Sequence, residues 1–460
     1  MTEAVPEPRQ RALPRVLGLF DVSVLASAAM GPAYSLAATM GPMVAAAGSY
    51  ATLSLALLFG IMLCIALSFA QLSRILPNAG SSFSWIASGF GRGAGTYAAW
   101  LLLLSNYFAT MTTALPAATY TLDLFAPQLA TSPAWDAAVG ALWIAASTAL
   151  LYFGLQLTAV TTMVFLVAEL LVVAASAVAA FVVHPAPEHL AAAATLPPIN
   201  PLPGIVTAMV LGIWMIDGWE VSAAASEESS GPAETPGRGG VLALTVTAVV
   251  LLFAMGAYLH VGSVAGFSAN QTDAMAYVAD RLGGPVWHVT IVATVLVSTA
   301  ATLWTTVLYL SRSVFAMGRD GVLPHVFGRL DARALPTNAL LLVFVGVTAF
   351  TLATGFWPTA ASVLNLVLDG TSVFLGALFC MSALATIKLL AGRSGASRLQ
   401  TRYIPAFGAF ALAAIILVDI VQSDATTRWI ELGGLLLGIP FAFWRGSVMR
   451  IVSPIPVGER

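Results

Sequence analysis

Charged residues are scarce in this chain: Asp, Glu, Lys and Arg make up 9% of its 460 residues, against about 25% in soluble globular domains. Hydrophobic residues reach 59%, and the mean hydropathy is +0.90. This composition excludes a water-soluble globule and predicts an all-α protein that crosses a lipid bilayer several times. The net charge of -2 also argues against nucleic acid as a partner, because such proteins carry clustered positive charge.

Cysteine is almost absent, and catalytic motifs are missing. Cys64 and Cys380 both lie in apolar runs, which favours two small buried side chains over a disulfide or a metal pair. The sequence contains no HExxH, GxSxG or GxxxxGK[ST], the motifs of metalloproteases, hydrolases and nucleotide-binding proteins. We therefore predict no catalytic residues, no metal site and no cofactor. An intramembrane enzyme that uses carboxylates as acid and base is the alternative from another class.

Twelve apolar segments are long enough to cross a bilayer, which takes about 20 residues each. They are 16–47, 50–73, 93–121, 134–153, 158–183, 204–225, 241–264, 285–317, 338–354, 360–390, 403–421 and 429–444. If both chain ends lie in the cytosol, the inner segments hold every Lys and Arg except Arg281 and Arg428, as the positive-inside rule requires. We predict a multi-pass protein of the plasma (inner) membrane with cytosolic tails, 1–15 and 445–460.

Two predicted spans contain residues that break helices. Gly31 and Pro32 are adjacent within the first span, and Asp217-Gly218 lies in the middle of the sixth. In lipid, irregular backbone is tolerated only where protein or a wet cavity surrounds it. Two interrupted spans, one in each half of a chain, are a sequence pattern typical of transporter binding sites.

Four passages together resemble the amino acid-polyamine-organocation (APC) superfamily of secondary transporters. They are MGPAYSLAATMGP in the first span, LPNAGSSFSWIASGFG after the second, EESSGPAETPGRGGVLAL before the seventh, and SRSVFAMGRDGVLPHVFGRLD after the eighth. The last is closely similar to the family's Arg-Asp-Gly, Leu-Pro loop and is the most specific. The resemblance covers about residues 16–340.

The resemblance implies the LeuT-type fold. This fold has two inverted five-helix repeats, in which helices one and six are unwound, followed here by two extra helices. The repeats would be 16–183 and 204–390, with an outer loop at 184–203 between them and the extra helices at 391–444.

The first interruption supplies candidate substrate-binding residues: Met30, Gly31, Pro32, Ala33 and Tyr34. In similar transporters a Gly-x-Gly sequence at this place offers N–H groups to a substrate carboxylate, and this chain has Gly31, Pro32 and Ala33 there. Because proline has no N–H, one donor of that carboxylate site is missing. The departure favours substrates with an amine and a weaker, displaced or missing carboxylate.

Asp217 is the first candidate for holding the substrate, since a carboxylate at a helix break can pair with an ammonium in a desolvated pocket. It can also cap the second half-helix. By the resemblance, Trp214 takes the place of an aromatic gate over the substrate, with ordinary packing as the alternative. The other candidate substrate-binding residues are Gly218, Trp219, Asn106 and Tyr107.

Carboxylates inside predicted spans are candidates for proton coupling, because an isolated one costs several kcal/mol in lipid unless it is protonated or paired. Glu169 in the fifth span and Asp369 in the tenth fit this role. The alternatives are a hydrogen bond to a neighbouring helix for Glu169 and an outer vestibule for Asp369. By contrast, we expect Glu220 to face the cytosolic helices.

Sodium coupling is the other possibility that the resemblance raises. LeuT-type sodium sites combine carbonyls of helix one with hydroxyls of helix eight, which gives Ser298 and Thr299 as candidates. Hard cations bind such oxygens, although Ser and Thr also serve helix packing in membranes.

We expect a secondary active transporter that carries an amino acid or a cationic organic amine, polyamines included, by alternating access. Coupling to H+ is favoured, and Na+ is the alternative ion. A non-transporting amine or amino-acid sensor is the other alternative, and no obligatory protein partner is expected.

Overall fold

The computed structural model describes residues 13–129, 132–182, 201–271, 274–356, 360–391, 397–446 and 448–451. These residues form helices, turns and one isolated bridge between Leu17 and Ser229. Nine segments of the described chain are long and apolar enough to cross a bilayer. The prediction of an all-helical, multi-span membrane protein is therefore confirmed, whereas the arrangement of twelve spans in two inverted repeats stays a prediction.

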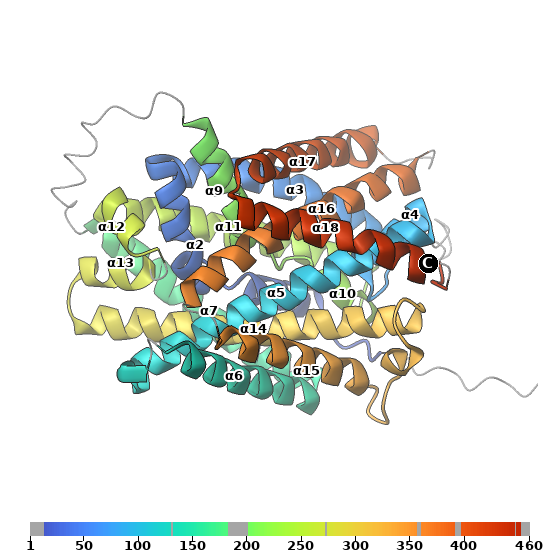
Figure 1. Ribbon diagram of the computed structural model, residues 1–460, viewed down its shortest axis with the longest axis horizontal. Coiled ribbons are helices and arrows are strands. Elements are labelled where there is room, and N and C mark those ends of the chain that lie inside the picture. The colour runs from blue at the N-terminus through green and yellow to red at the C-terminus, as the bar shows by residue number, and fades with distance from the viewer. Residues whose placement is uncertain are drawn as a thin grey trace, which may run out of the picture.

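The helices follow one another along the chain as a series of long rods with short helices between them (Figure 1). The α-helices are α1 Leu19–Met30, α2 Pro32–Ala47, α3 Ala51–Ile75, α4 Ser81–Phe90, α5 Arg92–Phe125, α6 Pro133–Phe153, α7 Leu155–Val182, α9 Leu202–Met215, α10 Val221–Ala224, α11 Thr235–Val261, α12 Val264–Ala269, α13 Ala274–Leu282, α14 Pro285–Arg319, α15 Thr337–Thr354, α16 Ala360–Leu390, α17 Ile404–Gln422 and α18 Ala425–Arg445. The short helical turns are η1 Gly48–Tyr50, η2 Pro127–Leu129, η3 Ala225–Glu227, η4 His325–Gly328 and η5 Leu399–Tyr403.

Both predicted interruptions are present. The first predicted span is two helices, α1 and α2, which meet at Gly31. The sixth is α9, which stops at Met215, followed by the short helix α10. The predicted outer loop at 184–203 lies mostly outside the described residues, as do most of the tails at 1–15 and 445–460.

The interrupted helices lie in the middle of the bundle, where α14 is their common neighbour. α14 contacts α1, α2 and α10, and 83% of its most apolar segment is buried. The corresponding buried share is only 33% in α6, α7 and α15, whose exposed apolar side chains are suited to lipid. The irregular backbone is thus enclosed by protein, which is the condition under which a membrane tolerates it.

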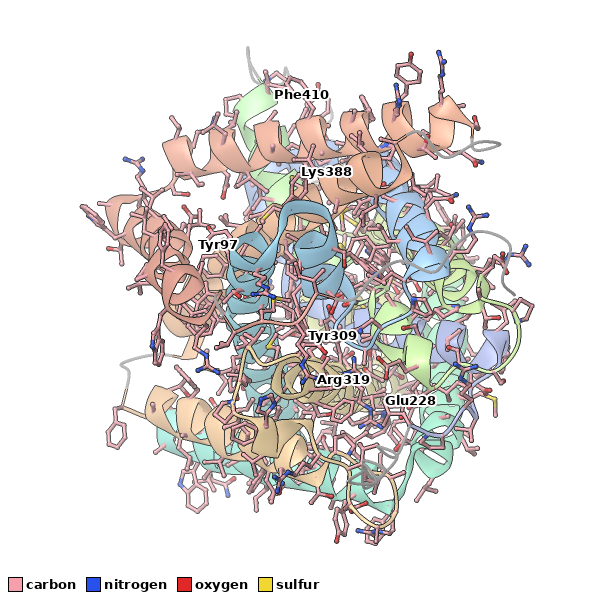
Figure 2. The ribbon with its side chains drawn as sticks, turned by 90° about the vertical axis from the view of Figure 1, so that its right-hand side faces the viewer. Tyr97, Glu228, Tyr309, Arg319, Lys388 and Phe410 are labelled. Atoms are coloured by element: carbon pink, nitrogen blue, oxygen red, sulfur yellow. The ribbon has the colours of Figure 1, made fainter. Side chains whose placement is uncertain are left out.

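Several charged side chains lie at one end of the molecule, called the charged end below. α12 and α13 lie at one end, and α4 and the C-terminal end of α18 lie at the other (Figure 1). Figure 2 looks onto this second end, where Glu228, Arg319 and Lys388 are found. Arg312 and Glu228 form an ion pair there with an N···O distance of 2.8 Å, and both side chains are almost fully buried.

Further contacts at this charged end tie the start of α1 to η3. The N–H groups of Val16 and Leu17 both donate to the carbonyl of Glu228. Arg319, at the end of α14, pairs with Glu227 at 2.8 Å. These bonds hold the start of α1, η3 and the end of α14 together at the charged end.

Candidate functional site

The first helix break is confined to Gly31. Its backbone is left-handed, with φ 53° and ψ 70°, a conformation that glycine adopts without steric cost. A Cβ at this position would collide with Oγ1 of Thr302 on α14. Pro32 then begins α2, where a missing N–H does no harm because the first N–H groups of a helix have no partner within it.

Two helices supply the partners for the first turn of α2. The N–H of Ala33 donates to Oε2 of Glu169, on α7, at 3.5 Å. The N–H of Tyr34 donates to Oγ of Ser298, on α14, at 3.1 Å. The Glu169 side chain is fully buried, and its Oε1 has no hydrogen-bond partner among the described residues. The first break is therefore a joint held by α7 and α14.

The second break is longer, because the chain from Ile216 to Glu220 has no regular helix. Gly218 has φ 111°, a conformation that other residues rarely adopt. A Cβ on Gly218 would lie 2.7 Å from the carbonyl carbon of Ala29 and 2.8 Å from the nitrogen of Met30. The second break thus runs directly against the end of α1, so the two breaks touch.

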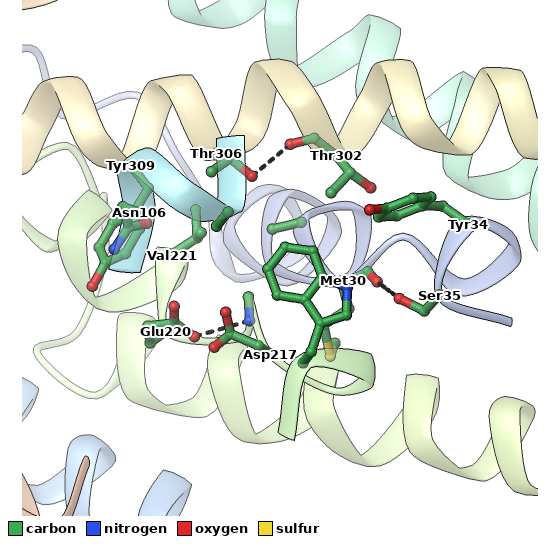
Figure 3. A pocket seen from close by; sticks show the side chains of 14 residues that line it. Met30, Tyr34, Ser35, Asn106, Asp217, Glu220, Val221, Thr302, Thr306 and Tyr309 are labelled. Carbon is green, nitrogen blue, oxygen red and sulfur yellow. Dashed lines mark hydrogen bonds between the residues drawn. The ribbon is translucent and has the colours of Figure 1, made fainter. Parts of the chain in front are cut away.

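Two acidic side chains lie side by side at the second break (Figure 3). Oε2 of Glu220 accepts a hydrogen bond from the N–H of Gly218 at 3.0 Å. Oδ1 of Asp217 is buried and has no hydrogen-bond partner among the described residues. The sequence-based expectation for Glu220 is wrong, since Glu220 lines the same cavity as Asp217. An unwound segment has no helical period, so the direction in which its side chains point cannot be inferred from their spacing in the sequence.

A narrow cavity separates the two breaks from α5 and α14 (Figure 3). It is lined by Ala29, Met30, Tyr34, Ser35, Asn106, Ala109, Trp214, Asp217, Gly218, Glu220, Val221, Thr302, Thr306 and Tyr309. The cavity volume is about 20 Å³, which is room for about one water molecule. A larger ligand therefore requires the walls to move apart.

The cavity contains polar atoms that a ligand can satisfy. Oδ1 of Asp217, Nε1 of Trp214 and the hydroxyl of Tyr309 are buried without a hydrogen-bond partner in the described chain. No Lys, Arg or His belongs to the described lining. Buried polar groups are normally hydrogen-bonded, so one carboxylate acceptor and two donors mark where a ligand would bind. The acidic pair makes positive charge favourable there.

The cavity brings together Met30, Tyr34, Asn106, Trp214, Asp217 and Gly218 from the predicted substrate-binding set. Gly31 at the first break, and Pro32 and Ala33 at the start of α2, are not part of the lining.

Two predicted residues point elsewhere. The Trp219 ring packs against Phe69, with ring centroids 4.9 Å apart. The hydroxyl of Tyr107 donates to the carbonyl of Leu342, on α15, at 3.4 Å.

The candidate residues for proton or sodium coupling are not part of the described cavity lining. Glu169 and Ser298 meet at the first break, outside the cavity lining. Oγ1 of Thr299 donates within α14 to the carbonyl of Val295 at 2.6 Å. Asp369 belongs to α16, but its side chain lies outside the described part of the structure. Within the described residues, no group of three or more His, Cys, Asp and Glu side chains is arranged to hold a metal ion.

Sequence reasoning missed the face of α14 that serves both breaks. Thr302 follows Ser298 by four residues, and Thr306 and Tyr309 continue the same face. Oγ1 of Thr302 donates to the carbonyl of Ala28, at the end of α1, at 2.9 Å. A polar stripe at spacings of four, four and three was the available signal, because residues so spaced share one side of a helix.

Comparisons with known proteins agree with this architecture. The family model described as "Amino acid permease" matches residues 17–430. The chain is similar to the branched-chain amino acid permease BcaP of Lactococcus lactis, with 29% identity over 309 residues, which are 62% of this chain and 65% of that relative. The match thus spans slightly less than two thirds of the Lactococcus protein.

Two further relatives are matched over a larger share. The uncharacterized amino acid permease YecA of Bacillus subtilis is 26% identical over 76% of this chain and 78% of its own. The uncharacterized transporter Rv1999c of Mycobacterium tuberculosis is 29% identical over 73% of each chain. The family model covers both helix breaks and most of the chain, so this protein belongs to the amino acid permease family of the APC superfamily, a family of membrane transporters and not of enzymes.

Proposed function

We propose that this permease is a proton-coupled secondary active transporter whose cargo, a cationic amine or an amino acid, binds through its ammonium group to Asp217. The observation that carries the proposal is Oδ1 of Asp217, which is buried beside Glu220 without a partner in the described chain. An ammonium has three N–H donors and a positive charge, so it satisfies this oxygen with a charge-assisted hydrogen bond.

Transport would follow alternating access in the LeuT-type arrangement. The halves 16–183 and 204–390 would move against each other, the helices in 391–444 would be additional, and the tails 1–15 and 445–460 would lie in the cytosol. The small cavity and the ion pair between Arg312 and Glu228 support a state closed at the charged end. The Arg and Lys side chains at that end favour a cytosolic location for it.

Proton coupling is assigned to Glu169 in this proposal. Its carboxyl group is fully buried and accepts from Ala33 at the joint between α2 and α7. Protonation turns a carboxylate into a weaker acceptor, so proton loading would loosen the hold of α7 on α2. Sodium is less favoured, because the hydroxyl of Thr302 already donates to the carbonyl of Ala28. Asp369 is the second candidate carrier.

A neutral branched-chain amino acid is the second candidate cargo. It is supported by the similarity to the Lactococcus permease, which is named for that substrate class. The apolar part of the cavity lining, including Met30 and Val221, would contact an aliphatic side chain while Asp217 held the ammonium.

Uptake into proteoliposomes under imposed gradients tests the proposal. Labelled putrescine, tyramine, lysine and leucine are offered with a proton gradient, a sodium gradient or none. Accumulation that follows the proton gradient and stops with a protonophore is expected for at least one of them. Accumulation driven by the sodium gradient alone would show that Na+ is the coupling ion. Binding without accumulation would indicate a sensor.

Asp217→Asn tests the ammonium site directly. Since a hydrogen bond to a charged group contributes about 1.5–3 kcal/mol, we expect the affinity for cationic amines to fall about 10-fold to 150-fold. Asp419→Asn, on α17, is the matched control, because Asp419 is also buried with an oxygen that lacks a partner in the described chain. Equal losses for amines in the two variants, or equal losses for amines and neutral solutes in Asp217→Asn, would indicate a structural role.

A further inference from the structure

Every N–H group in the first turn of α2 is already used. Helix N-termini are natural sites for anions, so a zwitterionic cargo would have its carboxylate placed here if donors were free. The acceptors are Oε2 of Glu169 for Ala33, Oγ of Ser298 for Tyr34 and the carbonyl of Gly31 for Ser35, and Pro32 has no N–H. No donor remains at the first break for an anionic ligand.

Two N–H groups of the second break are also used within the protein. The N–H of Gly218 donates to Glu220, and the N–H of Val221 donates to the carbonyl of Gly218. Four polar side chains of the lining donate to backbone carbonyls: Ser35, Asn106, Thr302 and Thr306. Among the described side-chain donors of the lining, Nε1 of Trp214 and the hydroxyl of Tyr309 are buried without a partner.

The acidic side chains near the two breaks also disfavour a bound carboxylate. Glu169 at the first break and Asp217 with Glu220 at the second bring three acidic side chains to the two touching breaks. The described lining contains no cationic side chain. A buried carboxylate without a cation or a full set of donors is strongly disfavoured.

We infer that Glu169 fills, from within the protein, the place where the carboxylate of a zwitterionic cargo would bind, so the preferred cargo is an amine without an α-carboxylate. This inference rests on the proposed function and names its substrate class. Glu169 acts as a specificity-determining residue: it contacts the helix N-terminus and excludes an anion from it. The ammonium of the cargo binds at Asp217, across the contact between the two breaks.

Matched ligand pairs test the inference on the full-length protein. Isoamylamine with leucine, tyramine with tyrosine, and putrescine with ornithine differ only by the carboxylate. Affinities are measured by thermal shift in detergent and by competition for uptake in proteoliposomes. We expect each amine to bind at least about tenfold more tightly than its amino acid, which corresponds to about 1.4 kcal/mol of binding free energy.

Variants of Glu169 test whether this residue sets the preference for amines, or whether removing any buried acid has the same effect. Glu169→Ala frees the N–H of Ala33 and removes a negative charge, so the amine preference should fall about tenfold. Glu169→Gln keeps an acceptor for Ala33 and removes only the charge, so an intermediate fall is expected, and it serves as the second variant if the alanine form does not fold. Glu431→Gln, at a fully buried acid on α18, is the control and should leave the preference unchanged.

The outcomes distinguish this inference from the proposed function. Wild-type protein that accepts leucine, tyrosine and ornithine as well as their amines overturns the inference and leaves the proposed function standing. An amine preference that is unchanged in both Glu169 variants removes the role of Glu169. Wild-type protein that binds neither member of any pair overturns the proposed function, and the inference falls with it.

Discussion

The two helix breaks differ in how their backbone and side-chain groups are satisfied. At Gly31 the helix is interrupted at one residue, and the N–H groups of Ala33 and Tyr34 donate to α7 and α14. At the second break the irregular stretch runs from Ile216 to Glu220, and an oxygen of Asp217 has no partner in the described chain. The first break is therefore a packed joint, whereas the second leaves a carboxylate oxygen without a partner at the cavity.

α14 connects these two functions. Ser298 and Thr302 contact the first break, and Thr306 and Tyr309 line the cavity beside the second. Because the four residues share one helix face, a displacement of α14 against α1 would change the joint and the cavity together. In the proposed mechanism, cargo bound at the second break would therefore alter the contacts of the first.

The largest expected effect comes from adding a methyl group at the glycine of each break. Gly218→Ala places Cβ against the backbone of Ala29 and Met30, which cannot rotate away. Gly31→Ala places Cβ against the side chain of Thr302. Strained backbone of this kind costs about 1–3 kcal/mol per residue. We expect both variants to lose stability and transport, and Gly218→Ala to lose more.

A second substitution sharpens this difference. Thr302→Ala removes the colliding hydroxyl, so it should partly restore Gly31→Ala and leave Gly218→Ala as impaired as before. The thermal unfolding midpoint and the initial uptake rate are measured for the single and double variants. Equal rescue of both glycine variants would contradict the distinction between a side-chain contact and a backbone contact.

An intermediate effect is expected for two adjacent hydroxyls on α14. Ser298→Ala leaves the N–H of Tyr34 without its acceptor, and an unsatisfied buried donor costs about 1–3 kcal/mol. Thr299→Val removes a hydroxyl that donates to Val295 within its own helix while the side-chain shape is kept, so it should cost less than about 1 kcal/mol. Thermal unfolding in detergent checks the order.

The same pair of variants bears on the coupling ion. If uptake is driven by protons, neither Ser298→Ala nor Thr299→Val should change a dependence on sodium, because there is none. A sodium-dependent uptake that both variants abolish would show that the two hydroxyls form an ion site, and the joint at the first break would then need a different description.

The positions of the breaks could be predicted because their causes are local. Gly31 with Pro32, and Asp217 with Gly218, are residues that disturb a helix wherever they occur. The apolar spans are predictable for the same reason, since each depends on about 20 consecutive residues. What these residues touch could not be derived in this way.

The partners at the site come from distant parts of the chain. Glu169 meets Ala33 across a separation of 136 residues, and nothing in the local sequence of α7 specifies that contact. The neighbours Asn106 and Tyr107 face different ways, because consecutive residues of a helix point about 100° apart. Asn106 lines the cavity and Tyr107 contacts α15. Which of the two faces the cavity can be decided only when the positions of the surrounding helices are known.

The smallest expected effect separates the two tryptophans that flank the second break. Trp214 lines the cavity, and its Nε1 is without a partner in the described chain. Trp219 packs its ring against Phe69 and Phe379, with centroid distances of 4.9 and 5.5 Å. Trp214→Phe removes one donor that faces a ligand, which is a loss of about 0.5–1.5 kcal/mol, so KM should rise roughly threefold to tenfold.

Trp219→Phe keeps an aromatic ring against Phe69 and Phe379, so its effect should appear in stability and not in the affinity for cargo. We expect KM to stay within about twofold of the wild-type value while the unfolding midpoint falls by a few degrees. A larger change in KM for Trp219→Phe than for Trp214→Phe would mean that the cargo reaches the aromatic cluster behind the break. The cavity would then extend past Gly218 toward α3 and α16 when its walls move apart, and the second break would be a passage as well as a site.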